Sequence, residues 1–528
     1  MSFPPTDQLP ASQSSWRAVP VSPNFRELAW GHVLPITLIA LVVMGITLRV
    51  INLLFEASLW EDEIFSVAMA ESPVTDLLLA ALRFDTHPPL YYVQLHLWAA
   101  LDDSDRWYIL NSTLFSIIAI IALFETCRRI YGWTVGLWAA AIFALMPLQL
   151  FFAENVRMYP MLALLQIGLW YVLQQMIVEK RATMRQLFVA LCLGLAVTFT
   201  HGLGFFVTFF LFLHAGLRLF KATPARDFRL LLATYVVVAL AALYPLAIGA
   251  VRQTEGVSGF DLPAIGIHLT LTLLGLEFPW PTIAGLLALP LMVLLPLTKT
   301  RDRWIGIFLV VVPIGVLLAI SLLAKPVFIY RTLGLFLPFL AISLALYADT
   351  AFKERIAAHR VAASVIVLLM LFGGVNYTMT FEKRGYREVV VAWEARSAED
   401  AIIMTNGPSE FWAVLRYLGD GTGRVSALEI QPPVRDGMLR LREKLDGFGA
   451  ASLGLFGKAD HAVVGKRHVY PYVAQDIIAV SPEVWILNPK SENCVLGDAE
   501  IPLEQRDALS LAGHNLTKCR NLQFGLKQ

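Results

Sequence analysis

Long apolar segments recur along this chain, and they constrain its fold more than any other feature. A helix needs about 17–25 largely apolar residues to cross a bilayer. The chain is 57% hydrophobic and only 16% charged, whereas about 25% of residues are charged in an ordinary soluble domain. We therefore predict a polytopic α-helical membrane protein with about eleven transmembrane helices. These are expected at residues 33–53, 109–127, 133–152, 160–178, 186–200, 203–220, 229–249, 282–298, 304–323, 332–348 and 361–379.

The split of residues 186–220 into two helices rests on the sequence His201-Gly202-Leu203-Gly204, because closely spaced glycines interrupt helices. Lys and Arg then set the orientation, since they concentrate in cytoplasmic loops. With the N-terminus cytoplasmic, the inner segments hold Arg17, Arg26, Arg128, Arg129, Lys180, Arg181, Arg185, Arg218, Lys221, Arg226, Arg229, Lys299, Arg301, Arg303, Lys353, Arg355 and Arg360. The outer loops hold only Arg83, Arg106, Arg157, Arg252, Lys325 and Arg331.

This orientation divides the chain into three parts. Residues 1–32 form a cytoplasmic tail, which lacks the apolar core and cleavage site of a signal peptide. Residues 33–380 form a transmembrane domain, and residues 381–528 form an extracytoplasmic α/β domain. The first outer loop, 54–108, is expected to contain amphipathic helices at 61–71 and 73–84 and an interfacial apolar piece that ends near residue 101. A half-helix is expected near 264–276.

In the C-terminal domain, apolar runs and helical periodicity alternate. Strands are expected at 401–406, 424–429, 461–464 and 484–487, and helices at 386–396, 409–417, 436–445 and 503–512. Cys494 and Cys519 could form a disulfide in an oxidising compartment, and two free thiols are the equal alternative. The spacing of the four cysteines is not that of a metal site.

Three consecutive carboxylates follow the first apolar segment, in the sequence Leu59-Trp60-Glu61-Asp62-Glu63-Ile64-Phe65-Ser66. A cluster of acids at a membrane face is costly unless it is solvated, paired or functional. Acids also favour the first turn of a helix, and Glu61 is expected to act there as the cap. The predicted topology places the cluster on the outer face.

Other polar side chains are expected on the same face. They lie in Asp85-Thr86-His87-Pro88-Pro89-Leu90-Tyr91-Tyr92, in Glu154-Asn155-Val156-Arg157-Met158-Tyr159, at His201 and at Arg331. Arginine stays charged and binds phosphate with a two-pronged geometry. Carboxylates and arginines at a membrane edge are therefore typical of group transfer from a phospholipid-like donor. In such a reaction a carboxylate takes the proton of an acceptor hydroxyl, and the cations stabilise the departing lipid phosphate.

The three stretches 59–66, 85–92 and 154–159 together resemble those of integral-membrane glycosyltransferases of the GT-C fold. The nearest group combines protein O-mannosyltransferases, aminoarabinose transferases and rhizobial galacturonic acid transferases. The resemblance covers about residues 33–380 and implies a polyprenyl-phosphate sugar donor, an extracytoplasmic active site and inversion at the anomeric carbon. It also implies a bacterial inner-membrane enzyme that modifies lipopolysaccharide, another envelope glycan or a protein.

The resemblance assigns roles residue by residue. Asp62 matches the catalytic acid of the first outer loop, with Glu63 beside it. Donor or lipid-phosphate binding is assigned to His87, Glu154, Arg157, Tyr159 and Arg331. His87 stands where some relatives have a lysine, so a phosphate contact there would depend on its protonation. Asp85 and His201 are further candidates.

Each candidate also has a purely structural interpretation. His87 and the two prolines could form a stiff turn before a helix, and the two arginines could anchor at the headgroups. His201 could serve only to break a helix pair. Asp62, Glu63, Asp85, His87 and Glu154 could ligate a divalent cation, but relatives with monophosphate donors resemble metal-free enzymes, and we expect no cofactor.

The expected partners are a lipid-linked sugar donor, a glycan, glycolipid or protein acceptor, and membrane lipids. A net charge of +1 argues against nucleic acid. The main alternative function is a transporter or flippase. Transporters place ionisable groups near the membrane midplane and contain internal repeats, whereas these acids lie at the outer edge. A receptor or assembly protein that works through its outer domain is a third alternative.

Overall fold

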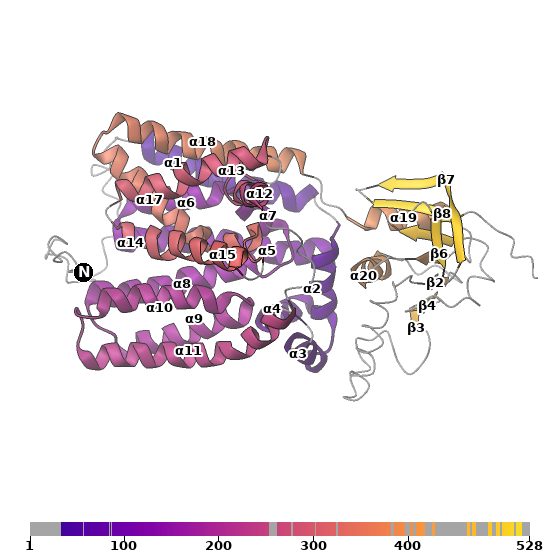
Figure 1. Cartoon of the computed structure of the whole chain (residues 1–528), viewed down its shortest axis with the longest axis horizontal. Coiled ribbons are helices and arrows are strands. Elements are labelled where there is room, and N and C mark those ends of the chain that lie inside the picture. The colour runs from indigo at the N-terminus through magenta and orange to yellow at the C-terminus, as the bar shows by residue number, and fades with distance from the viewer. Residues whose placement is uncertain are drawn as a thin grey trace, which may run out of the picture. The chain divides into compact units, whose positions relative to one another are not determined.

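The computed structural model describes residues 33–55, 58–83, 85, 87–252, 261–275, 278–300, 302–323, 326–381, 385–396, 402–404, 408–417, 425–427, 462–464, 467–470, 484–487, 493–496, 499–511 and 514–519. The described chain is mainly helical, with strands only in its C-terminal part (Figure 1). All statements below refer to these residues.

Seven helices or helical runs in the described residues are long and apolar enough to cross a membrane. Four are single helices. The other three contain local changes of helix type, which alter the regular hydrogen-bond pattern without ending the segment. In the same order, they are α1 (Val33–Phe55), α5 (Asp105–Tyr131), α8 (Tyr159–Glu179) and α18 (Ala357–Thr380), then α13 (Pro281–Leu289) with η2 (Pro290–Leu294) and η3 (Leu295–Thr298), α14 (Arg303–Gly306) with η4 (Ile307–Val311) and α15 (Val312–Leu323), and α16 (Tyr330–Leu333) with η5 (Gly334–Phe336) and α17 (Leu337–Lys353).

An eighth segment is bent. We expected one helix over 133–152, but α6 (Trp133–Leu145) and α7 (Pro147–Glu154) meet at an angle of 63°. Proline has no N–H to donate and its ring clashes with the preceding turn, so Pro147 accounts for the break. The other expected helices are α9 (Met184–Thr200), α10 (Gly204–Leu219) and α11 (Ala225–Arg252), and the expected half-helix is α12 (Leu262–Leu273). All eleven expected segments are thus helical.

The break between α9 and α10 lies where the sequence predicted it. The imidazole Nδ1 of His201 accepts the N–H of Leu203 at 2.9 Å, and the carbonyl of His201 accepts the N–H of Gly204 at 2.7 Å. A Cβ at Gly204 would collide with the backbone carbonyl oxygen of Val197. The turn therefore requires glycine, and His201 helps to build it. α9, α10 and α11 then run beside one another (Figure 1).

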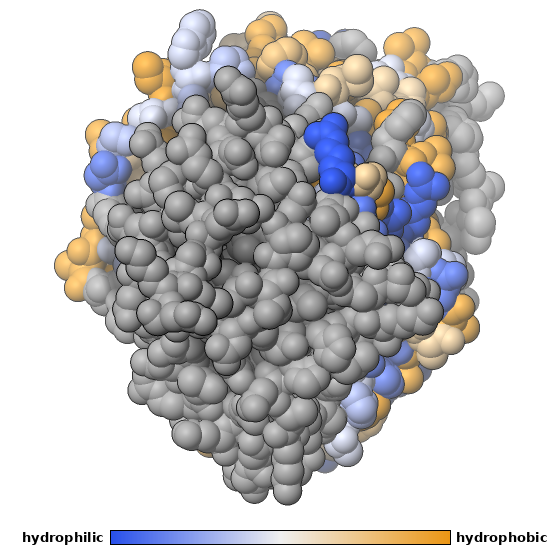
Figure 2. Space-filling view, turned by 90° about the vertical axis from the view of Figure 1, so that its right-hand side faces the viewer, coloured by the Kyte–Doolittle hydropathy of each residue, from blue (hydrophilic) through white to orange (hydrophobic). Residues whose placement is uncertain are grey.

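Apolar side chains remain exposed along the spanning helices, as expected for surfaces that face lipid. They include Val33 and Ile36 on α1, Ile118 and Ile121 on α5, and Leu368 and Phe372 on α18. Apolar residues, in orange, also lie on the described part of the surface in Figure 2. The chain is a multi-pass membrane protein, as its composition predicted.

The described residues belong to two compact units that do not follow chain order. The first comprises those within Met1–Leu48, Ser116–Leu150 and Met161–Tyr377. In it, α17 is buried along nearly its whole length and packs against α6. The second comprises those within Arg49–Phe115, Phe151–Pro160 and Thr378–Gln528. Its helices outside the spanning segments are α2 (Glu61–Glu71), α3 (Val74–Arg83), α4 (Leu90–Ala99), α19 (Arg387–Arg396) and α20 (Pro408–Tyr417).

The C-terminal part of the second unit contains two mixed sheets, which confirms the predicted α/β character. One has the strand order β1-β5-β8-β7-β6, with β1 parallel to β5 and the other pairs antiparallel. The other has the order β2-β4-β3, with β2 parallel to β4. The strands are β1 (Ile402–Met404), β2 (Val425–Ala427), β3 (Ala462–Val464), β4 (Arg467–Tyr470), β5 (Val484–Leu487), β6 (Asn493–Leu496), β7 (Ala499–Leu511) and β8 (His514–Cys519).

One secondary-structure prediction for this domain was wrong. Residues 503–512 were expected to be helical, but residues 503–511 lie in β7 and pair with β8. The stretch Leu503–Leu509 is rich in good helix formers, and pairing with β8 overrides that preference. The register of β7 with β8 shifts between Leu503 and Ala508, within this same stretch. The expected helix at 436–445 lies outside the described residues.

The register of the same sheet bears on the two C-terminal cysteines. Cys494 in β6 is opposite Ile501 of β7, and Cys519 in β8 is opposite Leu503. Two inter-strand steps therefore separate their backbones, which is roughly 9–10 Å. Cα atoms joined by a disulfide are about 4.4–6.8 Å apart. The backbone positions of the two residues are therefore farther apart than those of a disulfide.

Candidate active site

The carboxylate cluster begins at Trp60, which precedes the first turn of α2. One carboxylate oxygen of Glu63 accepts the backbone N–H of Trp60 at 3.0 Å. The other accepts the N–H of Val156 at 2.7 Å. Glu63 is fully buried, at 0% exposure, so these bonds replace the water that its charge would otherwise require. Glu63 caps α2 and ties α2 to the loop 155–158. The side chain of Glu61, which was expected to act as the cap, lies outside the described residues.

The loop 155–158 joins α7 to α8 and completes the same corner. The indole Nε1 of Trp60 donates to Oδ1 of Asn155 at 2.7 Å. Nη1 of Arg157 donates to the carbonyl oxygen of Asp62 at 3.1 Å and to Oγ of Ser66 at 3.2 Å. Residues about ninety positions apart in the sequence are thereby held together. Arg157 is placed over the first turns of α2.

Arg157 lies at the centre of a cluster of acidic and phenolic groups. Its side chain is buried, at 7% exposure. Burial by itself would lower the pKa of this guanidinium, but electrostatic interactions with the phenols of Tyr92 and Tyr159 and the carboxylates of Asp62 and Asp85 outweigh that effect and raise the pKa. Its Nε is buried and has no hydrogen-bond partner in the described part of the chain. Arg157 therefore carries a permanent positive charge with one donor still available.

Asp85 and Tyr92 form a second pair in this cluster. The hydroxyl of Tyr92 donates to Oδ2 of Asp85 at 2.5 Å. Burial first, and then the neighbouring carboxylate, raise the pKa of Tyr92 well above its ordinary value, so the phenol stays protonated and oriented. Between them, His87 is partly buried, and Pro88 and Pro89 lead directly into α4. Proline is pre-organised for a helix start, which agrees with the structural interpretation of these prolines.

Glu154 and Tyr159 flank the loop on its two sides. Glu154 is the last residue of α7 and is buried. Tyr159 is the first residue of α8 and stacks on Phe152, with ring centroids 4.2 Å apart and an interplanar angle of 15°. Both residues thus belong to the same unit as Asp62 and Arg157.

Two of the sequence candidates belong to the other compact unit. His201 builds the turn between α9 and α10. Arg331 lies in α16, where its Nε donates to the hydroxyl of Tyr330 at 3.1 Å and its guanidinium carbon lies 5.6 Å from that ring centroid. The ring of Tyr330 also stacks on that of His268, with centroids 6.3 Å apart.

The second unit therefore brings together Asp62, Glu63, Asp85, Arg157 and Tyr159 from three separate stretches of sequence. His87 and Glu154 belong to the same unit and the same stretches. Sequence reasoning missed three residues of this arrangement, namely Tyr92, Asn155 and Ser66. Each lies inside one of the sequences singled out above, so the signal was available at the level of the segment. Their roles depend on which residue faces which, and sequence spacing does not specify that.

No three His, Cys, Asp or Glu side chains in the described residues are placed to hold one ion. Both oxygens of Glu63 already accept backbone N–H groups, and Asp85 accepts the Tyr92 hydroxyl. These residues fit a hydrogen-bonded cluster around Arg157, and we derive no chemical step through a metal.

The solved structures similar to this chain are membrane glycosyltransferases of the GT-C fold, the class that the sequence resembles. ArnT from Cupriavidus metallidurans in the apo state has a TM-score of 0.49 at 10% identity, over 91% of this chain and 97% of that one. The same protein has been solved bound to undecaprenyl phosphate.

Two further structures match less of their own length. The Archaeoglobus fulgidus oligosaccharyltransferase in complex with zinc and sulfate has a TM-score of 0.45 at 11% identity over 71% of this chain, which spans 60% of that protein. The arabinofuranosyltransferase AftD from mycobacteria has a TM-score of 0.45 at 15% identity, over 86% of this chain and 35% of that one. No protein-family model and no curated protein sequence matches the chain.

Proposed function

We propose that this protein is an inverting glycosyltransferase that moves a sugar from a polyprenyl-phosphate donor to a hydroxyl acceptor outside the cytoplasm. The observation that carries the proposal is the placement of Arg157 over the start of α2, among Asp62, Asp85 and Tyr92. A buried guanidinium with an available donor suits a phosphate. A neighbouring carboxylate suits proton abstraction.

The proposed reaction is a single displacement. The carboxylate of Asp62 takes the proton of the acceptor hydroxyl while that oxygen attacks the anomeric carbon of the donor sugar. The new glycosidic bond forms as the bond between the anomeric carbon and the phosphate oxygen breaks, and attack from the opposite face inverts the centre. The lipid phosphate leaves with the bonding electron pair, and Arg157 stabilises its charge. Arg331 remains a candidate for binding the donor through the sequence resemblance.

The remaining residues have supporting roles in this proposal. Glu63 holds the start of α2 and the loop 155–158 through two backbone N–H groups. Asp85, kept oriented by Tyr92, balances the charge of Arg157. His87, Glu154 and Tyr159 are proposed to line the donor site.

The Lys and Arg distribution supports a cytoplasmic N-terminus, with the active site and the residues after 381 outside the cytoplasm. We propose the bacterial inner membrane as the location. Nucleotide sugars are confined to the cytoplasm, so an outer-face transferase needs a lipid-linked donor. Lipopolysaccharide or another envelope glycan is the acceptor class that we favour over a protein.

The test is comparative mass spectrometry of envelope glycans from cells with and without the gene, complemented by variants. A sugar substituent should disappear on deletion and return with the wild-type gene. Asp62→Asn should lower the product by about 100-fold or more, as expected for loss of a general base. Asp103→Asn, which neutralises an exposed acid in the same outer loop, should restore the wild-type product. Full product from Asp62→Asn would contradict the proposal.

A further inference from the structure

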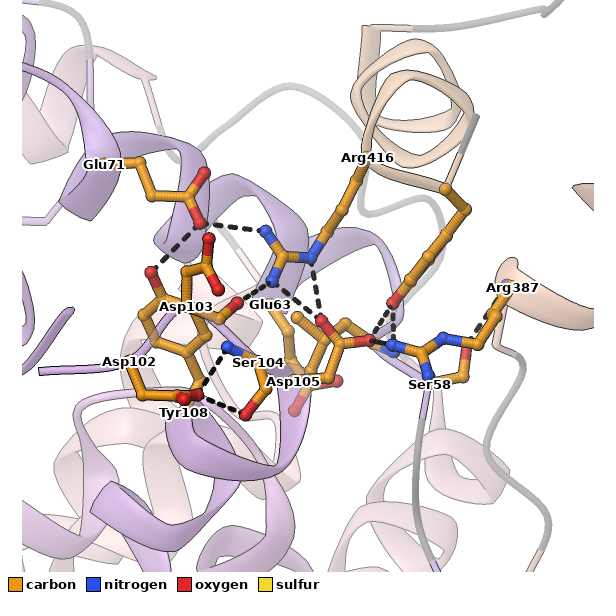
Figure 3. A network of polar contacts seen from close by, with 12 residues as sticks. Ser58, Glu63, Glu71, Asp102, Asp103, Ser104, Asp105, Tyr108, Arg387 and Arg416 are labelled. Carbon is orange, nitrogen blue, oxygen red and sulfur yellow. Dashed lines mark hydrogen bonds and ion pairs between the residues drawn. The ribbon is translucent and has the colours of Figure 1, made fainter. Parts of the chain in front are cut away.

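A buried polar network joins the two C-terminal helices α19 and α20 to the first outer loop (Figure 3). Its centre is Asp105, the first residue of α5, which is 2% exposed. Asp105 accepts the hydroxyl of Tyr417 at 2.6 Å, Nη2 of Arg387 at 2.9 Å and Nε of Arg416 at 2.8 Å. A buried carboxylate is tolerated only when it is paired and hydrogen-bonded in this way.

The network reaches the segment that precedes the candidate active site. The hydroxyl oxygen of Tyr417 accepts the backbone N–H of Leu59 at 2.8 Å. Next to it, the backbone N–H of Arg387 donates to Oγ of Ser58 at 3.2 Å. The chain approaches so closely here that a Cβ on Gly385 would collide with the Ser58 side chain. Two residues of the C-terminal helices thus fix consecutive residues of the outer loop.

The orientation of the Tyr417 hydroxyl is determined by its two partners. An ionised carboxylate only accepts hydrogen bonds and a backbone N–H only donates them. The single proton of the hydroxyl therefore points to Asp105, and a lone pair points to Leu59. Leu59 is fully buried, at 0% exposure, so no water can take the place of this acceptor. Loss of the hydroxyl would leave a buried N–H without a partner.

Leu59 is followed at once by the residues that organise the site. Trp60 binds Asn155 through its indole and receives the Glu63 cap on its backbone N–H. Asp62 comes two residues later, in the first turn of α2. A shift of the backbone at Leu59 is transmitted directly to this turn because no flexible segment intervenes.

We propose that Tyr417 is a positioning residue for the transfer reaction. It acts through the backbone of Leu59 to set the start of α2, and so the place of Asp62. The helices α19 and α20 of the C-terminal domain are then part of the working enzyme. The effect of Tyr417 on transfer rests on the proposed function, whereas its hydrogen bond with the N–H of Leu59 does not.

The test compares two substitutions that each remove one buried hydroxyl from this network. Tyr417→Phe removes the acceptor of Leu59. Tyr108→Phe is the matched control, because the Tyr108 hydroxyl donates to Glu71 at 3.0 Å and does not touch residues 58–60. Hydrogen exchange of the Leu59 amide, measured by mass spectrometry on the purified full chain, reports the hold itself. Binding of undecaprenyl phosphate and the amount of envelope product report its consequence.

In Tyr417→Phe the Leu59 amide should exchange about tenfold faster or more, and product should fall by about tenfold, because small misplacements of reacting groups have effects of this size. Undecaprenyl phosphate should bind within about twofold of wild type, as expected for a loss of turnover rather than of binding. Tyr108→Phe should match wild type in all three measurements.

Unchanged exchange at Leu59 in Tyr417→Phe would overturn the proposal, and so would an equal loss of product in both variants. Fast exchange of Leu59 in the wild-type protein would overturn it without any variant. If wild-type cells make no glycan product that depends on the gene, the proposed function fails. The exchange measurement would still decide whether Tyr417 holds Leu59.

Discussion

Glu63 and Asp62 are adjacent acids on one helix, and the structure predicts opposite consequences when each is converted to its amide. In Glu63→Gln one oxygen remains to accept an N–H, but the new NH₂ group faces the N–H of either Trp60 or Val156. One charge-assisted hydrogen bond is lost and one buried donor is left without an acceptor. Losses of this kind cost about 2–4 kcal/mol in total.

Hydrogen exchange of the Val156 amide measures this cost locally. A loss of 2 kcal/mol corresponds to about 30-fold faster exchange, since about 1.4 kcal/mol is tenfold. The apparent melting temperature in detergent should fall as well. Asp62→Asn is the matched control, because Asp62 is bound to Arg157 through its backbone carbonyl, which the substitution retains. It should leave the exchange of the Val156 amide at the wild-type level, because Asp62 does not contact that N–H, and it should remove transfer.

The reasoning is refuted if Glu63→Gln leaves the exchange of Val156 unchanged. It is also refuted if Asp62→Asn destabilises the protein as much as Glu63→Gln does. The first result would mean that the carboxylate is not the acceptor of that N–H. The second would mean that the two acids do not have separate roles.

Three further outcomes are expected. Tyr92→Phe removes the donor to Asp85 and should lower envelope product by about tenfold, since hydrogen bonds to charged groups contribute about 1.5–3 kcal/mol; unchanged product would exclude a role for this pair. Gly204→Ala should lower the apparent melting temperature because its Cβ collides with the backbone of Val197. Gly216→Ala on the same helix meets nothing within 4 Å and should be neutral or stabilising. Equal effects of the two substitutions would contradict the close approach of Gly204 to Val197. Burial first, and then Asp105, raise the pKa of Tyr417. The protonated Tyr417 therefore contributes its full stability below its unfolded pKa of about 10. This contribution should be lost as the pH rises through the higher pKa of the folded state. The ultraviolet titration of the wild-type protein minus that of Tyr417→Phe reports the ionisation of Tyr417. Ionisation near the ordinary tyrosine pKa of about 10 would contradict the raised pKa.

The spanning helices could be predicted from the sequence because each is a long apolar run, and a bilayer leaves such a run few alternatives. The bend at Pro147 was missed although proline is its cause, because the sequence does not say whether a proline kinks a helix or is accommodated. Residues 503–512 were assigned to a helix because Leu, Glu, Gln, Arg and Ala favour one locally. Their pairing with β8 depends on a strand that lies outside that window.

In the candidate site, too, the segments could be predicted from the sequence, whereas the contacts between them could not. The sequence identified the segments that hold Asp62, Asp85 and Arg157, since acids and arginines are unusual at a membrane edge. It could not show that Glu63 is occupied by the N–H of Val156, ninety-three positions away in the chain. Nor could it connect Tyr417 with Leu59, because a backbone N–H has no signature in the sequence.

The central claim is that Asp62 and Arg157 serve glycosyl transfer from a lipid phosphate. The most direct measurement uses purified protein in liposomes loaded with the lipid-linked sugars extracted from the native membrane, with the envelope glycan from deletion cells as acceptor. The account predicts release of polyprenyl phosphate and a new glycosidic bond of inverted anomeric configuration, both absent with Asp62→Asn. Movement of the lipid-linked sugar across the bilayer without release of polyprenyl phosphate would contradict the account and indicate a flippase.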